Sequence, residues 1–223
     1  YLREADYEHI IELWHIADVM ARGAALMTGT SFTSRVLGTA WPAYFNKPIA
    51  EAAYENIKRV GLPKWSDADQ TLAKALQHEL NVPERGLADT PAELREPASL
   101  ISQDPAAQAI GPLGGPSDDI GDVSWVVPTI TLRYPSNISG LPGHSWPNAI
   151  AMATPIAHKG VVAGAKVQAM TMLDILLRPE LVQQAWDYFR NVQTKDTKYR
   201  TLLRPDDKPA IWMNQQTMEK YRS

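Results

Sequence analysis

The stretch that most constrains this chain is residues 114–148, which read GGPSDDIGDVSWVVPTITLRYPSNISGLPGHSWPN. An acidic turn flanked by glycines comes first, an apolar run follows it, and a histidine framed by proline and glycine, His144, comes near the end. The run from Val123 to Leu132 is almost entirely apolar or β-branched, which is typical of a buried strand, although Pro128 favours a break or an edge position there. We expect this stretch to form the rim of an active site.

Helical periodicity predicts most of the remaining secondary structure. Asp6 can cap a helix that ends near Gly29, and a second helix runs from Ile49 to Val60, with Pro48 in its first turn. Ser66 opens a third helix, with Asp69 as its capping-box partner. Between the first two helices, residues 31–40 are β-branched enough to predict a strand.

Two further helices are predicted after residue 153. The first begins at Thr154 and Pro155 and ends at Arg178, and Gly164 allows it to pack closely. Its predicted buried stripe consists of Val162, Ala165, Ala169, Leu173 and Leu176. The last helix places Leu181, Ala185, Tyr188, Phe189 and Val192 on one face.

Composition excludes several classes of function. The chain has 223 residues, enough for one large domain or two small ones, and a net charge of −3, so we expect no nucleic-acid partner. It has no cysteine, which excludes disulfides, thiolate metal sites and thiol nucleophiles. No run of consecutive apolar residues approaches the ~20 that span a bilayer, and no signal peptide is visible, so we expect a cytoplasmic protein without a membrane partner. The chain begins at Tyr1 rather than Met, and we expect an N-terminal portion to be missing.

His144 is the first candidate for chemistry. A ligand histidine must be held in one tautomer with its ring aimed at the metal, and the stiff approach through Pro142 and Gly143 beside Trp146 would do that. A structural histidine bonded to nearby backbone is the alternative that spacing alone favours, because zinc needs three or four protein ligands.

The acidic turn is the second candidate. Its polar side chains can bind a hard cation or hydrogen-bond to a ligand histidine, or they can simply form an Asx-turn or a helix N-cap. These residues are Ser117, Asp118, Asp119 and Asp122. His158 at a helix start can support such a site or be an ordinary boundary residue, and Arg3 and Arg35 are possible clamps for a substrate carboxylate. The chain contains no Gly-x-Ser-x-Gly elbow, P-loop or dinucleotide fingerprint.

At these residues the sequence resembles the aminobenzoyl-glutamate utilisation protein B branch of the aminoacylase and carboxypeptidase-G type metallopeptidases. The motifs that carry the resemblance are SDDIGDVSW (117–125), PGHSW (142–146), GAALMTGT (23–30), NKP (46–48), GLPKW (61–65) and HKG (158–160). Together they run over most of the chain, from Tyr1 to about Arg190, although each motif alone would be weak.

The resemblance implies an α/β fold. Residues 1–43 would be the C-terminal part of a ferredoxin-like α+β satellite domain that dimerises, and residues 44–223 the C-terminal half of a two-metal, zinc-peptidase-like hydrolase domain with a mixed sheet. His144 falls on the last metal ligand of the family, and the acidic turn falls beside the metals, with Pro116, Asp118 and Ile120 in place of a Gly, a Glu and a Phe. Arg3 lies near a position that can carry a substrate-carboxylate arginine.

The resemblance also implies what this chain lacks. The other ligands of the two ions, Zn or Mn, and the glutamate that acts as general base have no counterpart here. We therefore expect a second polypeptide segment that completes the site, a homo- or hetero-oligomer, and no activity from this chain alone. The implied substrate is a small N-acyl or aryl amino acid, cleaved at its amide bond by metal-activated water. A catalytically inactive dimerisation or binding module is the alternative.

Overall fold

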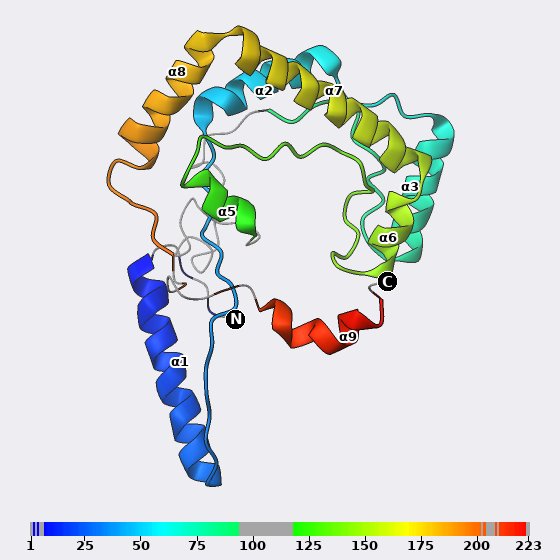
Figure 1. Ribbon diagram of the computed structural model, residues 1–223. Helices are drawn as coiled ribbons and strands as arrows, with labels where there is room; N and C mark the ends of the chain where they lie inside the picture. Colours follow the sequence, from blue (N-terminus) through cyan, green and yellow to red (C-terminus); the bar gives the residue numbers. More distant parts are fainter. Residues whose placement is uncertain are drawn as a thin grey trace. The chain divides into compact units, whose positions relative to one another are not determined.

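The computed structural model describes residues 2, 4, 7–93, 118–201, 203, 208 and 210–221. The described residues form helices joined by irregular segments, and no strand occurs among them (Figure 1). By their contacts they divide into two compact units. Unit 1 comprises the described residues within 1–44, 97–126 and 197–223, and unit 2 comprises those within 45–96 and 127–196.

The prediction of an α/β fold with a mixed sheet, preceded by the end of a ferredoxin-like α+β domain, is wrong for the part of the chain that the structure describes. Residues 31–40 have no ladder partner, so their β-branched composition does not produce a strand. The predicted strand from Val123 to Leu132 starts inside a helix, because Asp118 caps the helix and Ile120 N–H donates to its carboxylate at 3.1 Å. The rest of that run is irregular and contains Pro128, which has no N–H to donate.

Unit 1 holds one long helix and three short ones among its described residues. Helix α1 spans Tyr7–Thr28, as its periodicity predicts, and Gly29 follows it with a φ of 65°. The predicted cap, Asp6, lies outside the described residues. The short elements are α5 (Asp119–Ser124), the 3₁₀ helix η3 (Ile211–Asn214) and α9 (Gln215–Glu219).

Unit 2 is built from five α-helices and a π-helical turn among its described residues. They are α2 (Lys47–Val60), α3 (Asp67–Glu79), α6 (Trp146–Met152), α7 (Pro155–Leu177), α8 (Pro179–Tyr188) and η2 (Phe189–Gln193). The predicted capping box of α3 is confirmed in Ser66 and Asp69, and Pro48 and Pro155 lie in the first turns of α2 and α7 as predicted. Thr154 precedes α7, but its side chain makes no capping bond. Helix α2 packs against α7 and α8 (Figure 1). Across the contact with α7, buried Asn56 donates to Asp174 Oδ2 at 2.7 Å.

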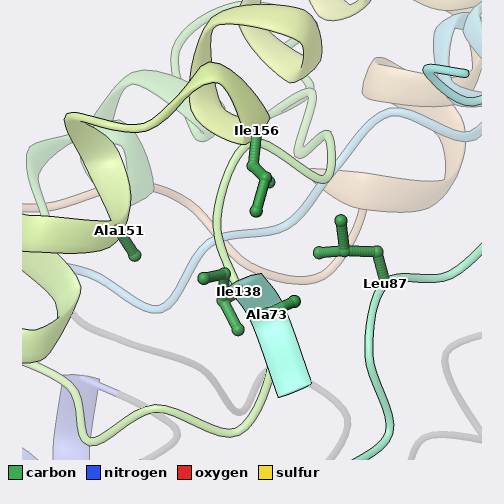
Figure 2. Packing of buried hydrophobic residues seen from close by; sticks show 5 residues of the cluster. All are labelled: Ala73, Leu87, Ile138, Ala151 and Ile156. Carbon is green, nitrogen blue, oxygen red and sulfur yellow. The ribbon is translucent and has the colours of Figure 1, made fainter. Parts of the chain in front are cut away.

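The apolar core of unit 2 gathers side chains from three helices and two loops. Figure 2 shows Ala73 of α3, Ala151 of α6 and Ile156 of α7 together with the loop residues Leu87 and Ile138. All five are buried, so α3, α6 and the start of α7 each contribute a side chain to one apolar cluster.

Polar bonds of two α3 side chains reinforce this core. Buried Gln77 accepts from Gly86 N–H at 2.8 Å and donates to Ser139 C=O at 2.9 Å. Gln70 of the same helix accepts from Leu87 N–H at 2.9 Å and donates to the Leu87 carbonyl at 3.1 Å. A fully bonded buried amide fixes its neighbours in one arrangement, so the loop that ends at Leu87 is anchored along α3.

Helix α7 buries the face opposite to the predicted one. Its buried residues are Ile156, Ala157, Gly160, Ala163, Gly164, Val167 and Thr171. The predicted stripe is exposed instead: Val162 and Leu173 are 55% and 53% accessible. The prediction was wrong because α7 is apolar on both faces, so that periodicity alone cannot select one of them.

The same property makes α7 the one helix among the described residues that is long and apolar enough, by length and composition alone, to cross a membrane. The prediction from the sequence concerned runs of consecutive apolar residues, and α7 contains no such run of that length. Lys159 and Lys166 interrupt any consecutive apolar run without making the helix polar on average. One face of α7 nonetheless packs within unit 2, where Lys159 contacts the buried carboxylate of Asp69.

Candidate functional site

His144 lies in the turn that leads into α6. Its φ is 51°, the left-handed region that residues with a β-carbon rarely adopt. Its side chain is exposed. Backbone strain of this kind is observed preferentially at functional sites, where the surrounding structure holds it in place. The histidine is therefore presented outward on a constrained turn.

Two side chains hold this turn through one carbonyl. The oxygen of Pro142 accepts a hydrogen bond from Ser145 Oγ at 2.6 Å and another from Asn148 Nδ2 at 2.8 Å. Asn148 belongs to the first turn of α6. Hydrogen bonds thus fix the chain on both sides of His144 to the start of that helix.

A second amide connects the turn to the core. Asn137 Nδ2 donates to Asn148 Oδ1 at 2.9 Å, and Asn137 Oδ1 accepts from the N–H of Ile138 at 2.7 Å. Ile138 is 3% exposed and lies in the core of unit 2. Neither asparagine was singled out from the sequence. The sequence does show one asparagine on each side of His144, Asn137 in the preceding loop and Asn148 at the start of α6. Only the folded chain brings these two side chains together.

Asp118, Asp119 and Asp122 of the acidic turn lie in unit 1, where two of these carboxylates, Asp118 and Asp122, accept hydrogen bonds within the fold. Asp118 caps α5, Asp119 is exposed in the first turn of that helix, and Asp122 accepts from Trp41 N–H at 3.1 Å and from the Tyr199 hydroxyl at 2.8 Å. Burial raises the pKa of Tyr199, and the bond to Asp122 raises it further. The same helix requires glycine at Gly121, because a β-carbon there would lie 1.8 Å from the carbonyl oxygen of Trp41.

An aromatic cluster surrounds Asp122. The ring of Trp41 lies 5.4 Å from the rings of both Trp125 and Tyr199 and 5.8 Å from that of Tyr7. Both indoles also donate to backbone carbonyls, Trp41 to Arg200 at 2.8 Å and Trp125 to Pro42 at 2.8 Å. Asp122 therefore joins three segments that are far apart in the sequence, a role that sequence reasoning missed.

The remaining predicted site residues are less informative. His158 is exposed in the first turn of α7. Arg35 lies with its guanidinium carbon 5.3 Å from the ring centroid of Trp212, a cation–π arrangement within unit 1. Arg3 and Ser117 lie outside the described residues.

The described donors do not fit a metal ion by themselves. No group of three or more histidine or carboxylate side chains lies close enough to hold one anywhere in the described part of the chain. His144 belongs to unit 2 and the acidic turn belongs to unit 1, so neither compact unit contains both. Since zinc takes three or four protein ligands, His144 can act only as one donor to a site that other groups complete.

Comparison with known proteins gives one informative relationship. The chain is similar to a p-aminobenzoyl-glutamate hydrolase subunit from Escherichia coli (strain K12), with 31% identity over 192 residues. This match covers 80% of the present chain but 39% of the relative, so the chain spans well under half of that protein's length. No family model matches the chain. No solved structure matches it either.

Proposed function

We propose that this chain forms part of a metal-dependent amidohydrolase that cleaves the amide bond between an aminobenzoyl or other acyl group and an amino acid such as glutamate. The observation that carries the proposal is the 31% identity over 192 residues to a protein named as a subunit of p-aminobenzoyl-glutamate hydrolase. Similarity that extends over 80% of the chain is better explained by shared ancestry than by short motifs.

In this proposal the chain supplies one portion of the catalytic unit. Residues 44–223 belong to the hydrolase domain and residues 1–43 to a dimerisation domain, where Arg3 binds the substrate carboxylate. A second polypeptide segment supplies the general base and the other ligands. The length of the relative outside the match and the lack of a three-donor cluster among the described residues support this division.

His144 is the residue that we propose as this chain's metal ligand. Its imidazole is exposed on a turn held by Ser145 and Asn148, which suits a donor that must meet groups from another segment. A divalent Zn or Mn pair would supply a Lewis acid that lowers the pKa of bound water and polarises the amide carbonyl. Asp118, Asp119, Asp122, Ser117 and His158 are proposed to support that site without binding the ions.

The exposed face of α7 supports the existence of the second segment. Val162, Leu173 and Leu176 are 55%, 53% and 75% accessible, although they are apolar and lie at helical spacing. A helix that is apolar on all sides is normally enclosed by protein or by lipid. We propose that the second segment covers this face, which makes the chain a member of a larger assembly.

Hydrolysis by the assembled protein tests the proposal. The assembly of this chain with the second segment, loaded with Zn²⁺ or Mn²⁺, should release p-aminobenzoate from p-aminobenzoyl-glutamate, and the isolated chain should not. His144→Ala should lower kcat/KM of the assembly by more than about 100-fold through loss of a ligand. His78→Ala is the matched control, because His78 is also an exposed histidine of unit 2 and its ring pairs with Glu84 on the surface.

A metal-free binding module is the second candidate, favoured by the lack of three clustered donors in the described residues. An assembly that holds no metal after reconstitution, together with an unchanged His144→Ala variant, would establish this alternative. Hydrolysis by the purified isolated chain would instead contradict the proposed second segment.

A further inference from the structure

A short irregular segment near the C-terminus closes the aromatic cluster of unit 1. Residues 197–201, which we call the C-terminal strap, belong to unit 1 and follow the end of unit 2 along the chain. The strap forms neither helix nor strand, and four of its five residues are exposed. Side-chain contacts must therefore hold it, because no helix or ladder fixes its backbone.

Tyr199 attaches the strap to two segments that are distant in the sequence. Its hydroxyl donates to Asp122 Oδ1 of α5 at 2.8 Å, and its ring centroid lies 5.4 Å from that of Trp41. Trp41 is buried and donates its own N–H to Asp122 Oδ2 at 3.1 Å. The Tyr199 hydroxyl therefore shares one carboxylate with the buried tryptophan against which its ring packs.

Arg200 attaches the strap to Trp41 and to the first turn of α1. Its carbonyl oxygen accepts from the Trp41 indole N–H at 2.8 Å, and its guanidinium carbon lies 4.7 Å from the ring centroid of Tyr7. The same guanidinium pairs with Glu8, and the two charged side chains are 60% and 67% exposed. Salt screens exposed ion pairs, so this attachment weakens as the ionic strength rises.

The described residues that follow the strap do not anchor it in a core. Helices η3 and α9 contain no buried residue, and Ile211 and Met213 are 82% and 56% exposed. Arg35 lies over the ring of Trp212 at 5.3 Å, but both side chains are exposed. Segments with few buried contacts open locally while the rest of a protein stays folded.

We propose that the strap is a releasable closure of unit 1, which opens when the bond between Tyr199 and Asp122 breaks while the other helices remain folded. Opening uncovers Trp41 where Tyr199 contacts it and frees Oδ1 of Asp122. The closed strap occupies both groups, so it controls access to an aromatic surface that carries a carboxylate. The inference uses contacts within unit 1 alone and does not rest on the proposed function.

Three indole N–H groups of the chain report on this opening separately. The Trp41 indole donates to the strap, the Trp125 indole donates to the Pro42 carbonyl in the same cluster, and the Trp65 indole donates to the Ala88 carbonyl in unit 2. Opening of the strap exposes the first group to solvent exchange, whereas global unfolding exposes all three.

Solvent exchange of the three indoles, measured by NMR on the purified chain, tests the proposal. Tyr199→Phe keeps the ring but removes the hydrogen bond to a charged acceptor, so Trp41 exchange should become about tenfold faster. Trp125 and Trp65 should exchange as in the wild type. Tyr221→Phe is the matched control, because it removes a hydroxyl from a residue that is 78% exposed beyond the strap.

An unchanged Trp41 rate in Tyr199→Phe would overturn the proposal, because the bond to Asp122 would then not hold the strap. An equal increase for all three indoles would also overturn it, because the strap would then be released only by global unfolding.

The wild-type chain provides a second test that requires no variant to fold. Raising NaCl from about 0.05 M to about 1 M should speed Trp41 exchange about threefold relative to Trp125, because the Arg200 attachment is screened. Glu8→Gln should remove most of this salt dependence. A salt effect that is equal for both indoles would contradict a strap held by Arg200.

Discussion

Asp69 shows how one side chain can join a helix start to a distant helix. Its carboxylate closes the capping box of α3 by accepting from Ser66 N–H at 2.7 Å and from Ser66 Oγ at 2.8 Å, and it also contacts Lys159 of α7. The carboxylate is buried, whereas Lys159 is partly exposed. The bond from Lys159 is the main cause that lowers the pKa of Asp69 to about 2, and the bonds from Ser66 add to it.

This pKa predicts a loss of stability in acid. Because the folded-state pKa of Asp69 is depressed, its contribution is complete above the unfolded value near 4 and disappears as the pH falls toward 2. The full contribution is about 2 kcal/mol. Lys159→Met should reduce the free energy of unfolding at pH 7 by roughly 1–3 kcal/mol and flatten its pH dependence between pH 4 and pH 2.

Urea denaturation of both proteins at pH 7, 4 and 2.5 measures the two effects. Lys166→Met is the control, because Lys166 is an exposed lysine of the same helix. An acid dependence that Lys159→Met leaves unchanged would show that Lys159 does not set the pKa of Asp69.

At the scale of elements, α7 depends on glycine for its approach to the loop before α6. A β-carbon at Gly160 would lie 2.1 Å from the carbonyl oxygen of Pro135, and one at Gly164 would lie 3.1 Å from Cβ of Tyr134. The first contact is with backbone, which cannot turn aside as a flexible side chain can. Close packing of α7 was predicted from Gly164, but Gly160 makes the tighter approach.

Alanine substitutions should therefore have opposite effects in two helices. Gly160→Ala should destabilise unit 2 by more than about 3 kcal/mol, since α7 must move away from the loop. Gly23→Ala in α1 should stabilise its helix by about 0.5–1 kcal/mol, because nothing lies within 4 Å of the added methyl and alanine has the higher helix propensity. Circular dichroism during urea titration measures both, and a harmless Gly160→Ala would contradict the predicted overlap.

At the end of α8, a π-helical turn changes which residues are buried. The face predicted from Leu181, Ala185 and Phe189 is buried, but Gln193 follows as the next buried residue and Val192 is 51% exposed. The π-helical turn η2 shifts the register by one residue, since the longer bonding interval rotates the helix face. Regular periodicity cannot predict such a shift.

At the scale of the whole molecule, the exposed stripe of α7 is the feature to be tested. Val162→Glu and Leu173→Glu place charges on it at sites that are 55% and 53% accessible. Together they should change the stability of the isolated chain by less than about 1 kcal/mol, because both sites are already in contact with water. They should weaken association with the second segment by more than about tenfold, since each would bury an unpaired charge.

Analytical ultracentrifugation of the mixed segments measures that association, with Gln184→Glu as a control that adds charge at an exposed site on α8. Cosedimentation of the isolated chain with phosphatidylcholine vesicles, lost in the double variant, would show instead that lipid covers the stripe. Unchanged association in the double variant would place the second segment elsewhere.

The sequence predicted the longer helices α1, α2, α3, α7 and α8, but not the short helices α5, α6, η3 and α9 or the way the helices pack. Pro48, Ser66 and Asp69 are local signals, because the groups that start a helix and the N–H groups that they affect lie within a few residues. The strand predicted after Asp118 was wrong because a strand requires a partner, and none occurs among the described residues. The sequence placed His144 after a proline–glycine approach, but the bonds from Ser145 and Asn148 that hold the turn were found only in the structure. The ligand role of the histidine stays a proposal.

By itself the sequence determined where α2, α3 and α7 begin and that His144 follows a stiff proline–glycine approach. Only the tertiary structure decided which face of α7 is buried, that Asp122 binds Trp41 and Tyr199, and that two asparagines connect the His144 turn to the core. The physical reason is range: caps and turns depend on neighbours along the chain, whereas burial and side-chain bonding depend on residues that meet only after folding.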